Sequence, residues 1–136
     1  VITAGTAIRE SMEILSHLEG VKVAAQAGTT GEDWIKENLP KATLVTLDGN
    51  IECLTGVESK LYDAAVEDLP VMEYMCKNSY TDLAVAVEIP TGEQYGIVVS
   101  KDNAELTKKI NKILEKMQDD SSMDDLKQKW FGTTDL

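Results

Sequence analysis

Two short polar segments of the sequence carry groups that could hold a small molecule between them. The first runs from Gln26 to Thr30 (QAGTT), and the second is the acidic pair Glu67 and Asp68. Each directly follows an apolar run typical of a buried strand, VKVAA or DAAV. Because ligands of open parallel sheets bind beyond the carboxyl ends of the strands, both segments are candidates for one binding site.

The first segment has the features of an anion-binding turn. A helix is expected to begin at residues 31–33 (GED). The first amides of a helix have no partner within it, and they lie at the positive end of its dipole. Gly28 allows the backbone to approach a ligand closely, and Thr29 and Thr30 add hydroxyl groups beside those amides. Hydrogen-bond donors of this kind suit a carboxylate.

The second segment offers negative charge, where the first offers hydrogen-bond donors. A carboxylate such as that of Asp68 suits an ammonium group, so the two segments together would hold both ends of an α-amino acid. The alternative is structural: Thr30, with Asp33 three residues later, resembles a capping box, and Asp68 precedes another expected helix. Both residues would then only cap helices, and their spacing alone leaves both interpretations open.

The elements that position these segments alternate between strand and helix patterns. This alternation before Ile89 predicts βαβ units, a largely parallel sheet and an α/β fold. Apolar residues spaced three or four apart indicate the helices, and Pro40 ends the first of them. The expected strands are 1–8, 21–25, 43–47, 63–66, 83–89 and 95–99, and the expected helices are 31–39, 51–61, 70–76, 106–117 and a last short one capped by Ser122.

The composition excludes several classes of function. The chain has 136 residues, 43% of them hydrophobic and 27% charged, which predicts one soluble domain or a large part of one. A net charge of -11 argues against a nucleic-acid partner. No stretch approaches the roughly 20 apolar residues of a membrane helix, and no signal-peptide pattern is present. The start at Val1, without Met, suggests a processed, excised or engineered piece.

Motifs for catalysis, nucleotide binding or metal binding are missing. There is no HExxH, GxSxG or Walker pattern, so no enzyme activity, cofactor or metal is predicted. Cys53 and Cys76 could form a disulfide or a metal pair, or could be two small hydrophobic residues on two helices. The single His17 is interpreted as a surface residue rather than a catalytic base or metal ligand.

The segment from Leu18 to Trp34, LEGVKVAAQAGTTGEDW, resembles the second-lobe opening of bacterial extracytoplasmic amino-acid-binding proteins. These are the solute receptors of ABC importers, with the type II periplasmic-binding fold. The likeness continues through DAAVEDLPVMEYM, EQYGIVVSKDNAEL, INKILEKMQDD and LKQKWFG. It implies a three-layer α/β/α lobe, with a crossover strand region at 1–15, a second-lobe core at 16–90, and a return strand and C-terminal helices at 91–136 that pack on the first lobe.

The resemblance also implies a role for each polar residue. In that family two lobes close on an amino acid, which is then passed to the permease of an ABC transporter. The turn contacts the α-carboxylate, the second acid pairs with the α-ammonium, and the remaining positions lie near the ligand side chain. The matching residues are Gly28, Thr29 and Thr30 for the turn, Asp68 for the acid, and Gln26 and Glu67 for the side-chain positions.

Departures from the family pattern qualify these roles. Members carry a first-lobe arginine that clamps the carboxylate, and nothing here matches it, because Arg9 lies in the crossover region. The first-lobe segments are also absent. We therefore expect weak or no binding of free amino acids, and a missing first lobe or a second copy of the chain as partner. Ser59 and Ser121 stand where the family often has Gly at turns.

The resemblance implies a fragment of a receptor whose parent protein is extracytoplasmic. Two other interpretations compete with this one. The chain could be a stand-alone engineered or excised lobe with no binding activity. Less in keeping with the motifs, it could be a lobe of an enzyme resembling cyclohexadienyl dehydratases, in which only Glu67 and Asp68 offer an acid or base.

Overall fold

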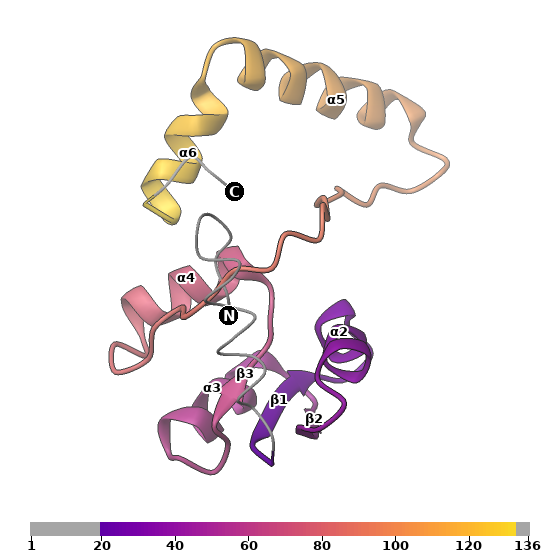
Figure 1. Ribbon diagram of the computed structural model, residues 1–136. Coiled ribbons are helices and arrows are strands. Elements are labelled where there is room, and N and C mark those ends of the chain that lie inside the picture. The colour runs from indigo at the N-terminus through magenta and orange to yellow at the C-terminus, as the bar shows by residue number, and fades with distance from the viewer. Residues whose placement is uncertain (1–19, 133–136) are drawn as a thin grey trace. The chain divides into compact units, whose positions relative to one another are not determined.

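The computed structural model describes residues 20–132 (Figure 1), which belong to two units divided between Pro90 and Thr91. Arg9 and His17 lie outside the described residues. The first unit contains β1 (Lys22–Gln26), α2 (Thr30–Asn38), β2 (Thr43–Leu47), α3 (Asn50–Glu58), β3 (Ala64–Ala65) and α4 (Leu69–Asn78). The second contains α5 (Ala104–Asp119) and α6 (Ser122–Trp130).

The sheet of the first unit is parallel, with strand order β2-β1-β3. β1 pairs with β2 along its whole length, from Lys22 opposite Thr43 to Gln26 opposite Leu47. It pairs with the much shorter β3 only through two residue pairs. β1 is therefore the central strand, and both neighbours end at the same edge of the sheet as β1 does.

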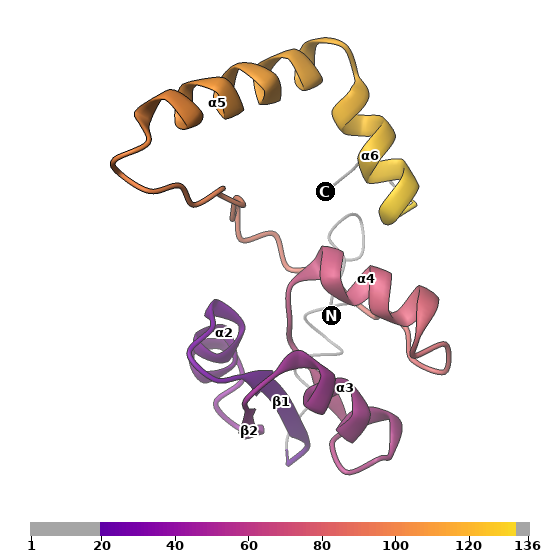
Figure 2. The same ribbon diagram turned by 180° about the vertical axis from the view of Figure 1, so that it is seen from behind.

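Helices cover both faces of this sheet, which confirms the predicted three-layer α/β/α arrangement. Val23 and Ala25 of β1 are buried against Ile35 of α2, whereas Ala24, between them in sequence, is buried against Cys53 of α3. Side chains alternate faces along a strand, so α2 and α3 must lie on opposite sides. Figures 1 and 2 show α2 and α3 flanking the strands in both views.

Two predicted strands are wrong. Neither 83–89 nor 95–99 forms a strand in the structure, although the first contributes the buried Val87 to the core beside α2. Tyr95, Ile97 and Val98 are all exposed. A strand forms only where a neighbour completes its backbone hydrogen bonds, and no described strand lies beside either segment.

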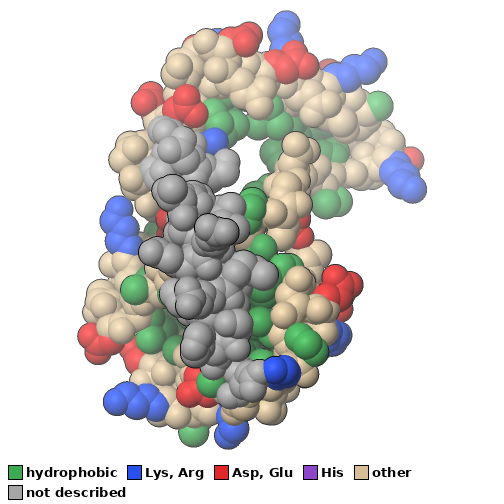
Figure 3. Space-filling view, in the orientation of Figure 1, with side chains coloured by type: hydrophobic (Ala, Val, Ile, Leu, Met, Phe, Trp, Pro, Cys, Tyr) green, Lys and Arg blue, Asp and Glu red, His purple; other side chains and the backbone are tan. Residues whose placement is uncertain are grey.

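The second unit consists of an extended segment and two amphipathic helices. α5 begins at Asn103, whose side chain accepts a hydrogen bond from the backbone N–H of Leu106. The residue preceding α6 is Ser121, and not Ser122 as expected, because Ser122 already lies in the helix and donates to Asp120. Hydrophobic side chains remain at the surface of both helices (Figure 3). No helix within residues 20–132 is long and apolar enough to cross a membrane.

Gly31 yields a first prediction, because its position brings α2 close to the end of β3. A methyl group at Gly31 would lie 2.9 Å from the backbone carbonyl oxygen of Val66. Without that contact, Gly31→Ala would stabilise a helix by about 1 kcal/mol. We expect the opposite sign, a loss of about 1–3 kcal/mol in the free energy of unfolding, measured by urea denaturation.

The control for this measurement is Gly49→Ala. A methyl group at Gly49, the N-cap of α3, would have nothing within 4 Å, so this change should cost only about 0.5–1 kcal/mol, from the preference for Gly over Ala at a helix N-cap. A stabilised Gly31→Ala variant would contradict the close approach of α2 to β3.

The two serines at glycine-like positions give a second prediction. Ser121 has φ 62°, in the left-handed region, whereas Ser59 has φ -80° and Lys60 takes the left-handed conformation in its place. The left-handed conformation that favours Gly therefore occurs at Ser121 and not at Ser59. Ser121→Gly should raise stability by about 1 kcal/mol in thermal unfolding followed by circular dichroism.

Ser59→Gly is the matched control for that substitution. Its hydroxyl donates to the backbone carbonyls of Thr55 and Gly56, so the glycine variant should be no more stable than the wild type. Equal gains at both positions would show that backbone conformation is not the cause.

Candidate functional site

The ends of β1 and β3 bring the two polar segments together, as the parallel sheet requires. The backbone N–H of Gln26 donates to Oε1 of Glu67 at 2.9 Å, across 41 residues of sequence. The Gln26 side chain donates to the carbonyl of Asp48, which follows β2, at 3.1 Å. The hydrogen bonds of Gln26 therefore connect the ends of all three strands.

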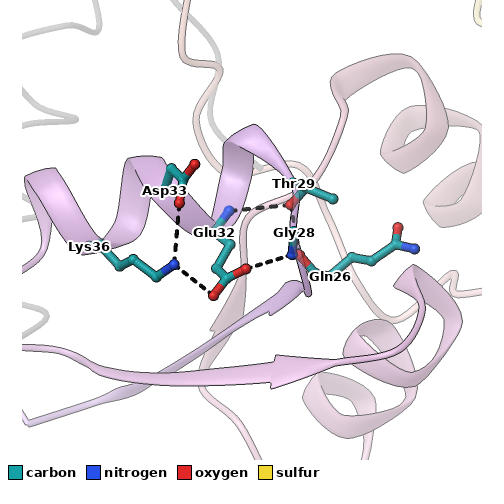
Figure 4. Close-up of polar contacts among 6 residues, drawn as sticks. All are labelled: Gln26, Gly28, Thr29, Glu32, Asp33 and Lys36. Atoms are coloured by element: carbon teal, nitrogen blue, oxygen red, sulfur yellow. Dashed lines mark hydrogen bonds and ion pairs between the residues drawn. The ribbon is translucent and has the colours of Figure 1, made fainter.

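The turn after β1 is closed by Thr29 rather than by Thr30. Thr29 Oγ1 donates to the carbonyl of Gln26 at 2.8 Å and accepts from the backbone N–H of Glu32 at 3.3 Å (Figure 4). Thr29 is therefore the N-cap of α2, and the expected box of Thr30 with Asp33 is wrong by one residue. The acidic residue of this cap is Glu32 instead of Asp33, and its longer side chain reaches back over the turn to the N–H of Gly28.

Gly28 supplies the left-handed conformation that this turn needs, with φ +73°. Its N–H donates to Oε2 of Glu32 at 2.6 Å, and Oε1 of the same carboxylate lies 2.8 Å from Nζ of Lys36. The Lys36 ammonium, followed by the Gly28 amide, holds the pKa of Glu32 below its usual range. The amide of Gly28 is thus already bound within the chain.

The donors left at this corner are the next amides along the chain. The backbone N–H groups of Thr29, Thr30 and Gly31 make no hydrogen bond to any residue within 20–132. The Thr30 hydroxyl is also without a partner in this range, and Thr30 is exposed. These groups stand at the positive end of the nine-residue helix α2, where a carboxylate is favoured.

Glu67 and Asp68 differ in their surroundings. Burial raises the pKa of Glu67, although hydrogen bonds from the Cys53 thiol and the Gln26 amide oppose the rise. Asp68 is exposed and precedes α4, but its side chain makes no capping hydrogen bond. Asp68 is the N-cap residue of α4 by position, so both interpretations of Asp68 stay open, while Glu67 is held from within the chain.

The cysteines are not bonded to each other. Both are free; Cys53 is buried beside Ala24 and Ala65, and Cys76 is partly buried. Burial, with the neighbouring Glu67 carboxylate, raises the pKa of the Cys53 thiol to about 12. Across the described residues, no group of three or more His, Cys, Asp or Glu side chains could hold a metal ion. The view of Cys53 as a small hydrophobic residue is confirmed.

A hollow of about 200 Å³ lies within the second unit, between the extended segment and α5. Its lining includes Tyr95, Ile97, Ile110 and Leu114, and none of the six predicted ligand residues. We give it no role in the site, because none of its lining residues carries a charge that could pair with either end of an amino acid.

Two residues of the corner were not identified from the sequence, Glu32 and Lys36. Their spacing of four residues is the usual one for an ion pair on a helix, and it could have been noticed. Both belong to α2, and Figure 4 shows their side chains pointing back toward Gly28.

Comparison with known proteins places these observations in context. Residues 5–133 match the family model described as "Bacterial extracellular solute-binding proteins, family 3". The L-cystine-binding protein TcyJ of Escherichia coli (strain K12) is 29% identical over 115 residues, which are 85% of this chain and 43% of that protein. The ABC transporter glutamine-binding protein GlnH of Bacillus subtilis (strain 168) is 31% identical over 113 residues, 83% of this chain and 41% of the relative.

Solved structures show the same likeness. One described as "An ancestral arginine-binding protein bound to glutamine" has a TM-score of 0.69 and 37% identity, and the match covers 87% of this chain and 53% of that one. The chain therefore spans about half the length of the proteins it matches.

The buried thiol gives a third prediction. With a pKa of about 12 for Cys53, the thiolate fraction at about pH 8 is on the order of one in ten thousand. In a Cys76→Ala chain, Cys53 should therefore resist Ellman's reagent until the chain is unfolded by guanidinium chloride. The Cys53→Ala chain is the control, and its partly buried Cys76 should react sooner. Rapid labelling of Cys53 in the native chain would contradict the buried position.

Proposed function

Because the chain belongs to family 3 of the bacterial extracellular solute-binding proteins, we propose that it supplies one half of an amino-acid site in a receptor of an ABC importer. The hydrogen bond between the Gln26 amide and the Glu67 carboxylate carries this proposal, since it joins the two segments that would hold the ligand. The relatives named above bind cystine or glutamine, or come from an arginine-binding line. An α-amino acid is the ligand class that we infer here.

The proposed contacts use the donors that remain at the turn after β1 and the negative charge of Asp68. The ligand carboxylate accepts hydrogen bonds from the amides of residues 29–31 and from the Thr30 hydroxyl. Its ammonium group pairs with Asp68. Gln26 and Glu67 border the ligand side chain, and Gly28 contributes the shape of the turn rather than a donor.

The remaining contacts of the proposed site would come from the half of the relatives that this chain does not match. We propose a first lobe as the usual partner and a second copy of the chain as the alternative, with an ABC permease receiving the ligand outside the cytoplasm. An arginine clamp on the carboxylate would belong to the lobe of the relatives that this sequence does not match. The chain alone should therefore bind amino acids weakly, because about half of the contacts are absent.

A role in binding is favoured over one in catalysis. Glu67 is the carboxylate at the strand ends with a raised pKa, and it accepts hydrogen bonds from Gln26 and Cys53. A general acid has to reach its substrate, whereas this side chain is directed to its own scaffold. We infer that the chain is not a dehydratase, and turnover of prephenate or arogenate would overturn that inference.

The test of the proposed site is a titration of the isotope-labelled chain with L-arginine, followed by amide chemical shifts. We expect the amides of residues 29–31 to shift with a dissociation constant of roughly millimolar order, and calorimetry to detect no micromolar binding of any common amino acid. Agmatine, which is arginine without the carboxylate, should leave those amides unchanged. Asp68→Asn should weaken binding roughly tenfold.

Asp82→Asn serves as the control for Asp68→Asn, since it removes the same charge from an exposed residue of the same unit. It should leave the affinity unchanged. Micromolar binding by the chain alone would contradict the half-site, and equal responses to arginine and agmatine would contradict the carboxylate corner.

A further inference from the structure

Glu32 differs from an ordinary surface carboxylate. Its side chain is only 14% exposed, and its two oxygens have separate partners, the Gly28 amide at 2.6 Å and the Lys36 ammonium at 2.8 Å. Lys36 also lies 3.2 Å from Oδ1 of Asp33. Figure 4 shows this chain of contacts running from the turn to the second turn of α2.

This arrangement puts negative charge beside a corner that is proposed to hold a carboxylate. Glu32 and Asp33 lie in the first turn of α2, next to the amides of residues 29–31. Like charges placed close together repel one another even in water. Glu32 and Asp33 together carry a charge of -2, and Lys36, the only cation of α2, brings the net charge of the three side chains to -1.

Another ion pair of this spacing, on α5, shows the contrast. Glu105 and Lys109 on α5 lie 2.7 Å apart, with side chains 79% and 67% exposed. Within the described residues, Glu105 accepts no hydrogen bond from a turn amide. The pair on α5 is therefore a surface contact, whereas the pair on α2 also determines which donors of the turn remain available.

Building on the proposed function, we propose that Glu32 and Lys36 together are positioning residues for the ligand carboxylate. Glu32 binds the Gly28 amide and so restricts the ligand to the amides of residues 29–31. Lys36 neutralises Glu32, so that the carboxylate holding the turn does not repel the carboxylate of the ligand. Neither side chain needs to touch the ligand for this role.

The first part of the test needs no ligand. The amide shift of Gly28 should titrate with Glu32, with a midpoint below the ordinary value because Lys36 and the Gly28 amide lower the pKa of this carboxyl. The lowered pKa means that the contact stabilises the turn above the unfolded-state pKa and is lost as the pH falls through the folded-state value. Glu32→Gln should abolish this step, and Lys36→Met should move it to higher pH.

The second part measures binding of L-arginine and of sodium acetate through the amides of residues 29–31. Lys36→Met should weaken binding of both by roughly two- to fivefold. Lys109→Met is the matched control, with the same substitution in the pair on α5, and it should change neither the affinity nor the Gly28 midpoint.

The outcomes separate the two proposals. If the wild-type amides respond to neither arginine nor acetate, the proposed function fails, and the ligand role of the pair fails with it. If they respond and Lys36→Met binds as the wild type does, the inference alone is overturned. A Gly28 amide that shifts with ligand as strongly as those of residues 29–31 would also overturn it.

Discussion

The hydrogen bond from the Gln26 amide to the Glu67 carboxylate is the contact on which the candidate site depends. β3 has only two residues, Ala64 and Ala65, so its ladder with β1 ends early. The Glu67 side chain supplies one more link beyond the last backbone pair. Because this carboxylate is partly withdrawn from water, the bond is shielded from competing solvent. It sets the position of Asp68 relative to the turn after β1.

Small residues make this close arrangement possible. β1 is central and buried on both faces, and its alanines let α2 and α3 pack near the strand. Gly31 does the same for the start of α2, which meets the carbonyl of Val66 with no room for a methyl group. The helix amides that could bind an anion are thus held at the end of β3 by the absence of side chains rather than by an attractive contact.

The parts of the fold that local patterns determine were predicted well from the sequence. The strand at 43–47 agrees with β2 to the residue, because TLVTL is bounded by Pro40 and the Asp48–Gly49 turn. The segment YGIVV at 95–99 has equally strong β propensity and still forms no strand, since pairing depends on a neighbour that local sequence does not encode. The predicted cap of α2 was wrong by one residue because either of two adjacent threonines could begin a capping box. The box prefers Glu three residues after the cap, and this preference favours Thr29 with Glu32 over Thr30 with Asp33.

The six residues predicted for the site remain a proposal, but the structure separates them by how their polar groups are used. The Gly28 amide, the Thr29 hydroxyl and the Glu67 carboxylate are bound within the chain. These bonds fix the turn in advance, so a ligand need not order it on binding. Sequence could indicate residue types that suit a carboxylate and an ammonium; it could not indicate which donors the fold would use itself. That allocation depends on Glu32, whose side chain binds the Gly28 amide, whereas the amides of residues 29–31 have no partner within the described residues.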